Sequence, residues 1–317
     1  MHLNRLTSML NIKYPIIQGG MGNISNAILT ASVSEAGGLG TIGSGTLTPF
    51  EVEEIIKETL KSTRKPFAVN IALGVSPYVK DILSLVIKYK IPIVSLSAGN
   101  PAPFIPQLRE HNIKTIAIVA TVRQAIKAEA AGADIIVAEG YEAAGINSTH
   151  ETTTLVLIPQ IARSVKIPVV AAGGIADGSG LAAMLALGAS GVQMGTRFIV
   201  TKEAPFHEEY KKIIIEANDN NTVIIGRSVG RIRRILSTKY AEKLLEFEKI
   251  GLSIEDFNHH TSEDFHCIGA LKGDGEKGFM NSGQIAGLID DLPTVQSLLD
   301  QMMSDANLQL KSASLLL

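Results

Sequence analysis

Short runs of apolar residues recur along the first two hundred residues, and a more polar stretch follows each run. The runs are continuous rather than alternating, which is typical of parallel strands that are covered on both faces. This pattern predicts eight strands, at residues 15–20, 38–43, 66–73, 91–99, 114–120, 134–140, 167–174 and 191–198.

The stretches between these runs have the features of helices. "TPFEVEEIIKETLKST" begins with Thr48 as a cap, Pro49 in the first turn and Glu51 three residues after the cap. Eight strand–helix units within about 200 residues predict an α/β fold, the TIM (β/α)8 barrel. A doubly wound sheet is the alternative, but functional-looking residues after nearly every predicted strand favour the barrel.

The pattern changes after Phe198. Residues 200–275 contain amphipathic segments without a recognisable strand between them, so we predict a helical insertion or cap after strand eight. The barrel is then formed by residues 1–199 and 276–317. In the cap, "GRSVGRIRRIL" places Arg227, Arg231 and Arg234 on one face if it is helical. That face is either a clamp for a ligand phosphate or a basic surface that is solvated or paired with acidic residues.

Glycines gather where the predicted strands end. Gly173 and Gly174 follow strand seven, and Gly195 with Thr196 follows strand eight. Glycine has no Cβ, so backbone N–H groups there can approach an anion closely, and a following helix N-terminus adds partial positive charge. The loops after strands seven and eight form the usual phosphate site of a TIM barrel, which favours a phosphorylated ligand over ordinary turn glycines.

Other residues at predicted strand ends fit a flat ligand. Gly19 and Gly20 after strand one allow close approach of the backbone, and Asn70 either bonds a ligand or ties the mouth together. The sequence has no P-loop motif and no cluster with metal-ligand spacing, so no metal site is predicted. Flavin mononucleotide (FMN), with one phosphate and a flat ring, satisfies these constraints.

Composition limits the partners. The chain has 317 residues, 45% of them hydrophobic and 19% charged, with a net charge of −2, so nothing draws it to nucleic acid or an anionic membrane. The first residues lack a signal-peptide pattern, and no stretch approaches a membrane span. We therefore expect a cytoplasmic protein with a small-molecule substrate, and leave open whether it forms a homodimer.

Seven motifs in order resemble the nitronate monooxygenase family and also the flavin-dependent enoyl-ACP reductase branch of the same superfamily. They are "YPIIQGGM", "AGGLGTIG", "FAVNI", "AEGYEAAG", "VVAAGGIADG", "GVQMGTRF" and "NSGQIAGL", between about Leu6 and Leu288. The resemblance implies a TIM barrel that holds FMN without a covalent bond. The FMN contacts it implies are Gly19, Gly20, Met21, Asn70, Glu139, Gly145, Gly173, Gly174, Gly195 and Thr196.

The chain departs from the family after strand six. Members of the family carry Ala-Gly-Gly-His or Ala-Gly-His there, and the His serves near the flavin as a base or proton donor. Ile146 stands in the place of that His. His150, four residues later, is a candidate replacement or an exposed loop residue, and Asn147 and Ser148 are candidate hydrogen-bond donors to a substrate.

Three residues are candidates for contact with the substrate. Ile146 is one, and Ser282 and Gln284 of "NSGQIAGL" are the others. For Ser282 the alternative is that it caps a helix that begins there.

These features predict an FMN-dependent oxidoreductase that oxidises alkyl nitronates with O2. A nitronate is already an anion, whereas a neutral nitroalkane must first lose a proton to a base, so we expect nitronate to be the better substrate. The alternatives are an NAD(P)H-dependent flavin reductase such as an enoyl-ACP reductase, whose arginines would grip a phosphate, and a flavin-binding barrel without catalysis.

Overall fold

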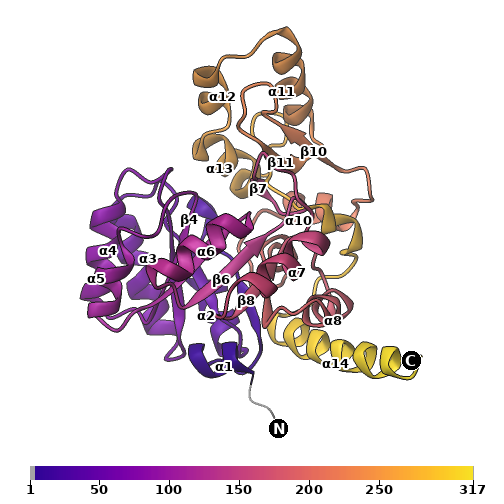
Figure 1. Ribbon diagram of the computed structural model, residues 1–317. Helices are drawn as coiled ribbons and strands as arrows, with labels where there is room; N and C mark the ends of the chain where they lie inside the picture. Colours follow the sequence, from indigo (N-terminus) through magenta and orange to yellow (C-terminus); the bar gives the residue numbers. More distant parts are fainter. Residues whose placement is uncertain (1–3, 317) are drawn as a thin grey trace.

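The computed structural model describes residues 4–316 and contains a cylinder of eight parallel strands (Figure 1). The strands follow one another around the sheet in the order β1-β9-β8-β6-β5-β4-β3-β2, and a parallel bridge between Ile17 and Leu39 joins its two ends. All eight lie within the predicted ranges: β1 (Ile16–Gln18), β2 (Gly40–Gly43), β3 (Phe67–Ala72), β4 (Ile93–Ser97), β5 (Lys114–Val119), β6 (Ile135–Glu139), β8 (Val169–Ala172) and β9 (Gly191–Met194). The TIM barrel prediction is confirmed.

Helices cover the outside of the barrel between the strands. They are α2 (Ala27–Glu35), α3 (Pro49–Ser62), α4 (Val79–Lys88), α5 (Ile105–Glu110), α6 (Val122–Ala131), α7 (Thr154–Ser164) and α8 (Gly178–Ala186). α3 begins as predicted, because Thr48 accepts a hydrogen bond from the Glu51 N–H while the Glu51 carboxylate accepts one from the Thr48 N–H. No helix within residues 4–316 is long and apolar enough to cross a membrane.

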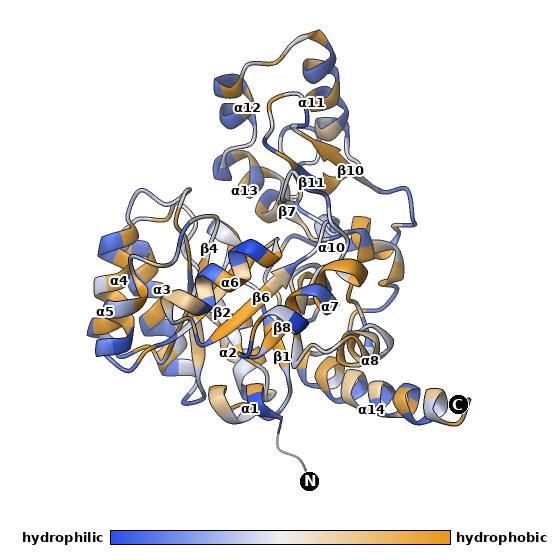
Figure 2. Cartoon of the chain, viewed as in Figure 1, coloured by the Kyte–Doolittle hydropathy of each residue, from blue (hydrophilic) through white to orange (hydrophobic). Residues whose placement is uncertain are grey.

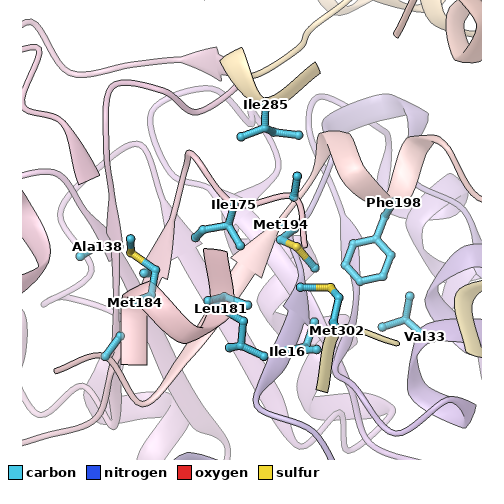
Figure 3. Close-up of a cluster of buried hydrophobic side chains, with 14 of the residues drawn as sticks. Ile16, Val33, Ala138, Ile175, Leu181, Met184, Met194, Phe198, Ile285 and Met302 are labelled. Atoms are coloured by element: carbon cyan, nitrogen blue, oxygen red, sulfur yellow. The ribbon is translucent and has the colours of Figure 1, made fainter. Parts of the chain in front are cut away.

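The core has two layers. One fills the space between the strands and the outer helices, where apolar strand residues predominate (Figure 2). α14 (Val295–Ser314) packs against α8, and Met302 joins Ile16, Met194 and Phe198 in this layer (Figure 3). The second layer lies inside the barrel, where Leu6 of α1 (Arg5–Leu10) packs with inward-facing strand residues. α1 thus closes the amino-terminal end of the cylinder and leaves only the opposite end for a ligand.

The segment after β9 is not wholly helical, which corrects the prediction for residues 200–275. It contains α10 (Glu208–Ile215), α11 (Lys239–Ile250), α12 (Ile254–His260) and α13 (Glu263–Lys272), but also the antiparallel strands β10 (Thr222–Ile225) and β11 (Arg233–Leu236). β11 pairs further with β7 (Gly145–Ile146), which belongs to the loop after β6. The cap therefore stands over the barrel mouth and is joined to it by a small sheet (Figure 1).

The same correction applies to the arginine cluster. Residues 226–231 form a turn closed by the Arg231 N–H and the Gly226 carbonyl at 2.8 Å, and β11 begins two residues later. Arg227, Arg231 and Arg234 therefore share no helical face. In an extended strand Arg233 and Arg234 instead project to opposite sides.

Candidate functional site

A cavity of about 850 Å³ lies at the carboxyl ends of the barrel strands, beneath the cap. Strands converge there from all sides, because parallel strands of a barrel end at one mouth. The ten residues predicted as FMN contacts all lie in its wall: Gly19, Gly20, Met21, Asn70, Glu139, Gly145, Gly173, Gly174, Gly195 and Thr196. The structure thus brings the predicted flavin site together in one place.

The loops after β8 and β9 form a cradle of backbone amides. Gly173 and Gly174 have φ angles of 94° and 72°, a left-handed conformation that favours glycine. Among residues 4–316 nothing in the protein accepts hydrogen bonds from their N–H groups or from that of Gly195. A Cβ built on Gly195 would have no protein atom within 4 Å. These free donors and the open space beside them suit an anion such as a phosphate.

The opposite wall of the cavity is closely packed. A Cβ on Gly20 would lie 2.7 Å from the Asn70 Cβ, so only glycine fits there. The Asn70 amide donates to the Ser95 and Ser97 hydroxyls at 3.2 Å each. Asn70 therefore ties β3 to β4, as one of the two alternatives predicted, while its side chain remains part of the cavity wall. A flat ligand would find a rigid surface here.

Two carboxylates from the β6 end behave differently. Burial raises the pKa of Glu139 to about 7. Glu142, by contrast, accepts hydrogen bonds from the Thr154 N–H at 2.9 Å and the Thr154 hydroxyl at 2.8 Å. It caps the first turn of α7, so Glu139 is the carboxylate of this pair that is open to a ligand.

The loop after β6 holds the predicted catalytic candidates at the cavity wall. Ile146 in β7 is 50% exposed and lines the cavity, as expected of a candidate for contact with substrate. Asn147 donates through its amide to the Ala143 carbonyl at 2.8 Å, and the Ser148 hydroxyl accepts from the His150 N–H at 3.2 Å. His150 itself is exposed. Asn147 and Ser148 are thus already engaged in shaping the loop.

Ser282 and Gln284 do not line the cavity, contrary to the predicted contact with substrate. The Ser282 hydroxyl is buried and donates to the Gly283 carbonyl, and Gln284 is exposed where the 3-10 helix η2 (Gln284–Leu288) begins. The wall is formed by Asn281, Gly283 and Ile285 instead. The predicted segment does line the cavity, but through the alternate residues, because successive side chains of an extended chain point to opposite sides.

Sequence reasoning missed a polar cluster that the cap adds to the cavity. Glu263 and His266 lie three residues apart on one face of α13, and the carboxylate is 3.6 Å from His266 Nδ1. Burial opposes ionisation of Glu263, but the hydrogen bond and charge of His266, with the charge of Arg233 and the Asn23 N–H, lower its pKa to about 2. The E-x-x-H spacing of Glu263 and His266 within the predicted cap was the available signal.

The His266 ring is enclosed. It is 2% exposed and stacks on Phe279 with ring centres 5.2 Å apart and planes within 9°. Its Nδ1 faces Glu263, and the Asn281 amide lies 3.3 Å from its Nε2. Both ring nitrogens therefore already have partners within the protein.

Two of the predicted arginines fasten the cap to the barrel loops. Arg227 donates to Glu151 at 2.9 Å and to the Tyr141 hydroxyl, while Arg234 donates to the Tyr141 carbonyl and to the Thr222 hydroxyl, each at 3.2 Å. These contacts favour the structural alternative for Arg227 and Arg234 over a phosphate clamp.

Comparison with known proteins agrees with this geometry. The sequence model of the nitronate monooxygenase family matches residues 4–82 and 71–305. A probable nitronate monooxygenase of Staphylococcus saprophyticus is 32% identical over 96% of this chain and 97% of that protein. The structure of FabK from Thermotoga maritima is 40% identical with a TM-score of 0.92 and 99% of both chains covered. A nitroalkane oxidase from Streptomyces ansochromogenes is 26% identical with a TM-score of 0.85, over 97% of this chain and 99% of that one.

Proposed function

The chain belongs to the nitronate monooxygenase family and is a flavin-dependent oxidoreductase, and on this premise we propose that it holds FMN and oxidises alkyl nitronates with O2. The amide cradle after β8 and β9 would hold the single phosphate, and the wall at Gly20 and Asn70 would support the ring. A bound flavin supplies the electron-transfer chemistry, while the protein binds and orients the substrate against it.

Ile146 is the observation that carries this choice of substrate. It lines the cavity where the resemblance implies a histidine, so no base stands at that position. The ring nitrogens of His266 are engaged by Glu263 and Asn281. His150 and Glu139 also line the cavity, and equal rates on a nitroalkane and its nitronate would identify one of them as a base. A neutral nitroalkane must lose the proton on the carbon beside its nitro group, whereas a nitronate has already lost it. The site therefore suits the anion.

The first prediction compares ethyl nitronate with neutral nitroethane near pH 7. We expect kcat/KM to be higher for the nitronate by about 100-fold, the usual contribution of a positioned base that this site lacks at residue 146. Oxygen uptake and nitrite release measure the rates. Mass spectrometry of the flavin released by heating the protein identifies the cofactor. Equal efficiency would contradict the absence of a base, and no turnover of either compound would reject nitronate oxidation.

A second candidate is an NAD(P)H-dependent flavin reductase such as an enoyl-ACP reductase. The 40% identity to FabK over 99% of both chains favours it, since this exceeds the 32% identity to the probable nitronate monooxygenase. Anaerobic mixing with NADH or NADPH separates the two. Rapid bleaching of the flavin by either nucleotide would favour the reductase, and bleaching by ethyl nitronate alone would favour nitronate oxidation.

A further inference from the structure

Within residues 4–316, Arg233 is a buried charge without a hydrogen-bond or ion-pair partner. Its side chain is 8% exposed and lies in the cavity wall. No group among residues 4–316 accepts a hydrogen bond from the guanidinium or forms an ion pair with it within 4.0 Å. Burying an unpaired charge costs free energy, so proteins normally pair such groups or use them to bind a ligand.

The surroundings of Arg233 leave its N–H edges free. The guanidinium carbon lies 4.9 Å from the centre of the Phe279 ring, a cation–π arrangement that uses the charge without an acceptor for the N–H groups. The nearby carboxylate of Glu263 is engaged by His266 and by the Asn23 N–H at 3.1 Å. Burial lowers the pKa of Arg233, with Glu263 acting in the opposite sense, so the protein compensates this charge only in part.

The small sheet places Arg233 beside Ile146. The two residues are direct partners in the antiparallel β7–β11 pair, and both line the cavity. Directly opposite residues of such a pair project from the same face with Cβ atoms about 5 Å apart. The free donors therefore adjoin the position at which the family resemblance implies a histidine.

We propose that Arg233 anchors the substrate through a planar anionic group with two oxygens. The in-plane N–H groups of a guanidinium match such a group with two parallel hydrogen bonds, a geometry that lysine does not offer. This inference rests on the proposed function to the extent that the two oxygens of a nitronate are one such group. A carboxylate elsewhere on the substrate has the same shape and charge.

Calorimetric titration of the FMN-loaded protein with acetate and with acetamide tests the anchor without turnover. Acetate carries the planar anion, and acetamide is its neutral counterpart of nearly equal size. We expect acetate to bind at least about tenfold more tightly than acetamide, since a charge-assisted bidentate pair is strong. Arg233→Gln is expected to abolish this difference, Arg233→Lys to retain part of it, and Arg231→Gln, at an exposed arginine outside the cavity, to leave it unchanged.

Kinetics distinguish the two sources of the anion. If the nitronate oxygens bind Arg233, Arg233→Gln raises KM for ethyl nitronate about tenfold with a smaller change in kcat. If a separate carboxylate binds, only the nitronate of 4-nitrobutanoate shows that rise. Either result supports the anchor, whereas acetate affinity equal in the wild type and Arg233→Gln overturns it.

The test of the Arg233 anchor can be distinguished from the test of the proposed function. An Arg233-dependent acetate site in a protein that does not oxidise nitronates would reject the proposed function and retain the anchor. Arg233→Gln also removes the cation–π contact with Phe279 and a charge that lowers the pKa of Glu263, so acetate binding is compared in variants whose circular-dichroism spectra match that of the wild type.

Discussion

The barrel mouth and the cap contribute different chemistry to one cavity. The strand ends of the barrel supply backbone amides, glycines and the small residues around them, while the cap supplies Arg233, Glu263 and His266. The first set follows from the fold, because every parallel strand ends at the same mouth. The second belongs to a segment inserted after β9. The difference supports the proposal that the barrel binds the cofactor and the cap selects the substrate.

Glu263 joins the two regions. Its carboxylate accepts a hydrogen bond from the Asn23 N–H at 3.1 Å, in the short helix η1 (Gly22–Ile24) that follows Gly20 of the cavity wall. A Cβ on Gly22 would lie 2.7 Å from the same carboxylate, so the contact is close. Substrate-side changes in α13 are therefore expected to reach the flavin loop through this contact.

The largest effect is expected from Gly195→Ala on the barrel side. No protein atom lies within 4 Å of the added methyl group, so the apo-protein is expected to keep its Tm. A phosphate held by the neighbouring amides would be displaced, and loss of one charge-assisted hydrogen bond, about 2 kcal/mol, weakens FMN binding about 30-fold. Fluorescence titration of apo-protein with FMN measures this. Unchanged affinity would place the phosphate elsewhere.

Ile146→His tests the barrel loop that pairs with the cap, and it is expected to have a smaller effect. It places an imidazole beside Arg233, whose positive charge disfavours a second cation and so keeps the ring in its basic, neutral form. We expect kcat/KM for neutral nitroethane to rise about tenfold while that for ethyl nitronate changes little. A variant with no gain on nitroethane would show that residue 146 is too far from the reacting carbon.

The barrel and its amide cradle could be predicted because their signals are local. Each strand is a continuous apolar run, and the glycines that end β8 and β9 need no knowledge of distant partners. The small sheet could not be predicted from the sequence, since β7 is two residues long and becomes a strand only by pairing with β11, far along the chain. The prediction that Ser282 and Gln284 contact the substrate was wrong for another reason. A shift of one residue in an extended segment exchanges the side chains that face inward and outward.

Arg233 and His266 were missed because the cap was predicted from its own periodicity. "GRIRRIL" fits a helix as well as a strand when its partner is unknown, and the two interpretations place different arginines toward the barrel. For α13 only the general prediction of a helical cap applied, and nothing local shows which face of the helix meets the cavity. Tertiary contacts decide both questions.

The smallest expected effect concerns two carboxylates, one from each region, that respond to pH in opposite directions. Burial raises the pKa of Glu139 from its ordinary 4.5 to about 7, so its contribution to stability is present below pH 4.5 and is lost as pH rises through 7. The pKa of Glu263 is lowered to about 2, so its contribution is present above pH 4.5 and is lost as pH falls toward 2.

The free energy of unfolding of the apo-protein, from denaturant titrations between pH 3 and pH 8, tests this contrast. Relative to the wild type, Glu139→Gln is expected to gain stability progressively as the pH rises from 5 to 8, because glutamine does not ionise in the buried site. Glu263→Gln is expected to be less stable than the wild type at pH 7 and to approach it as the pH falls below 4.5. If both variants differ from the wild type by the same amount at every pH, the two carboxylates do not titrate as their surroundings require. The surroundings of Glu139 in the barrel and of Glu263 in the cap would then not differ in their effect on a carboxylate, contrary to the contrast drawn between the two regions.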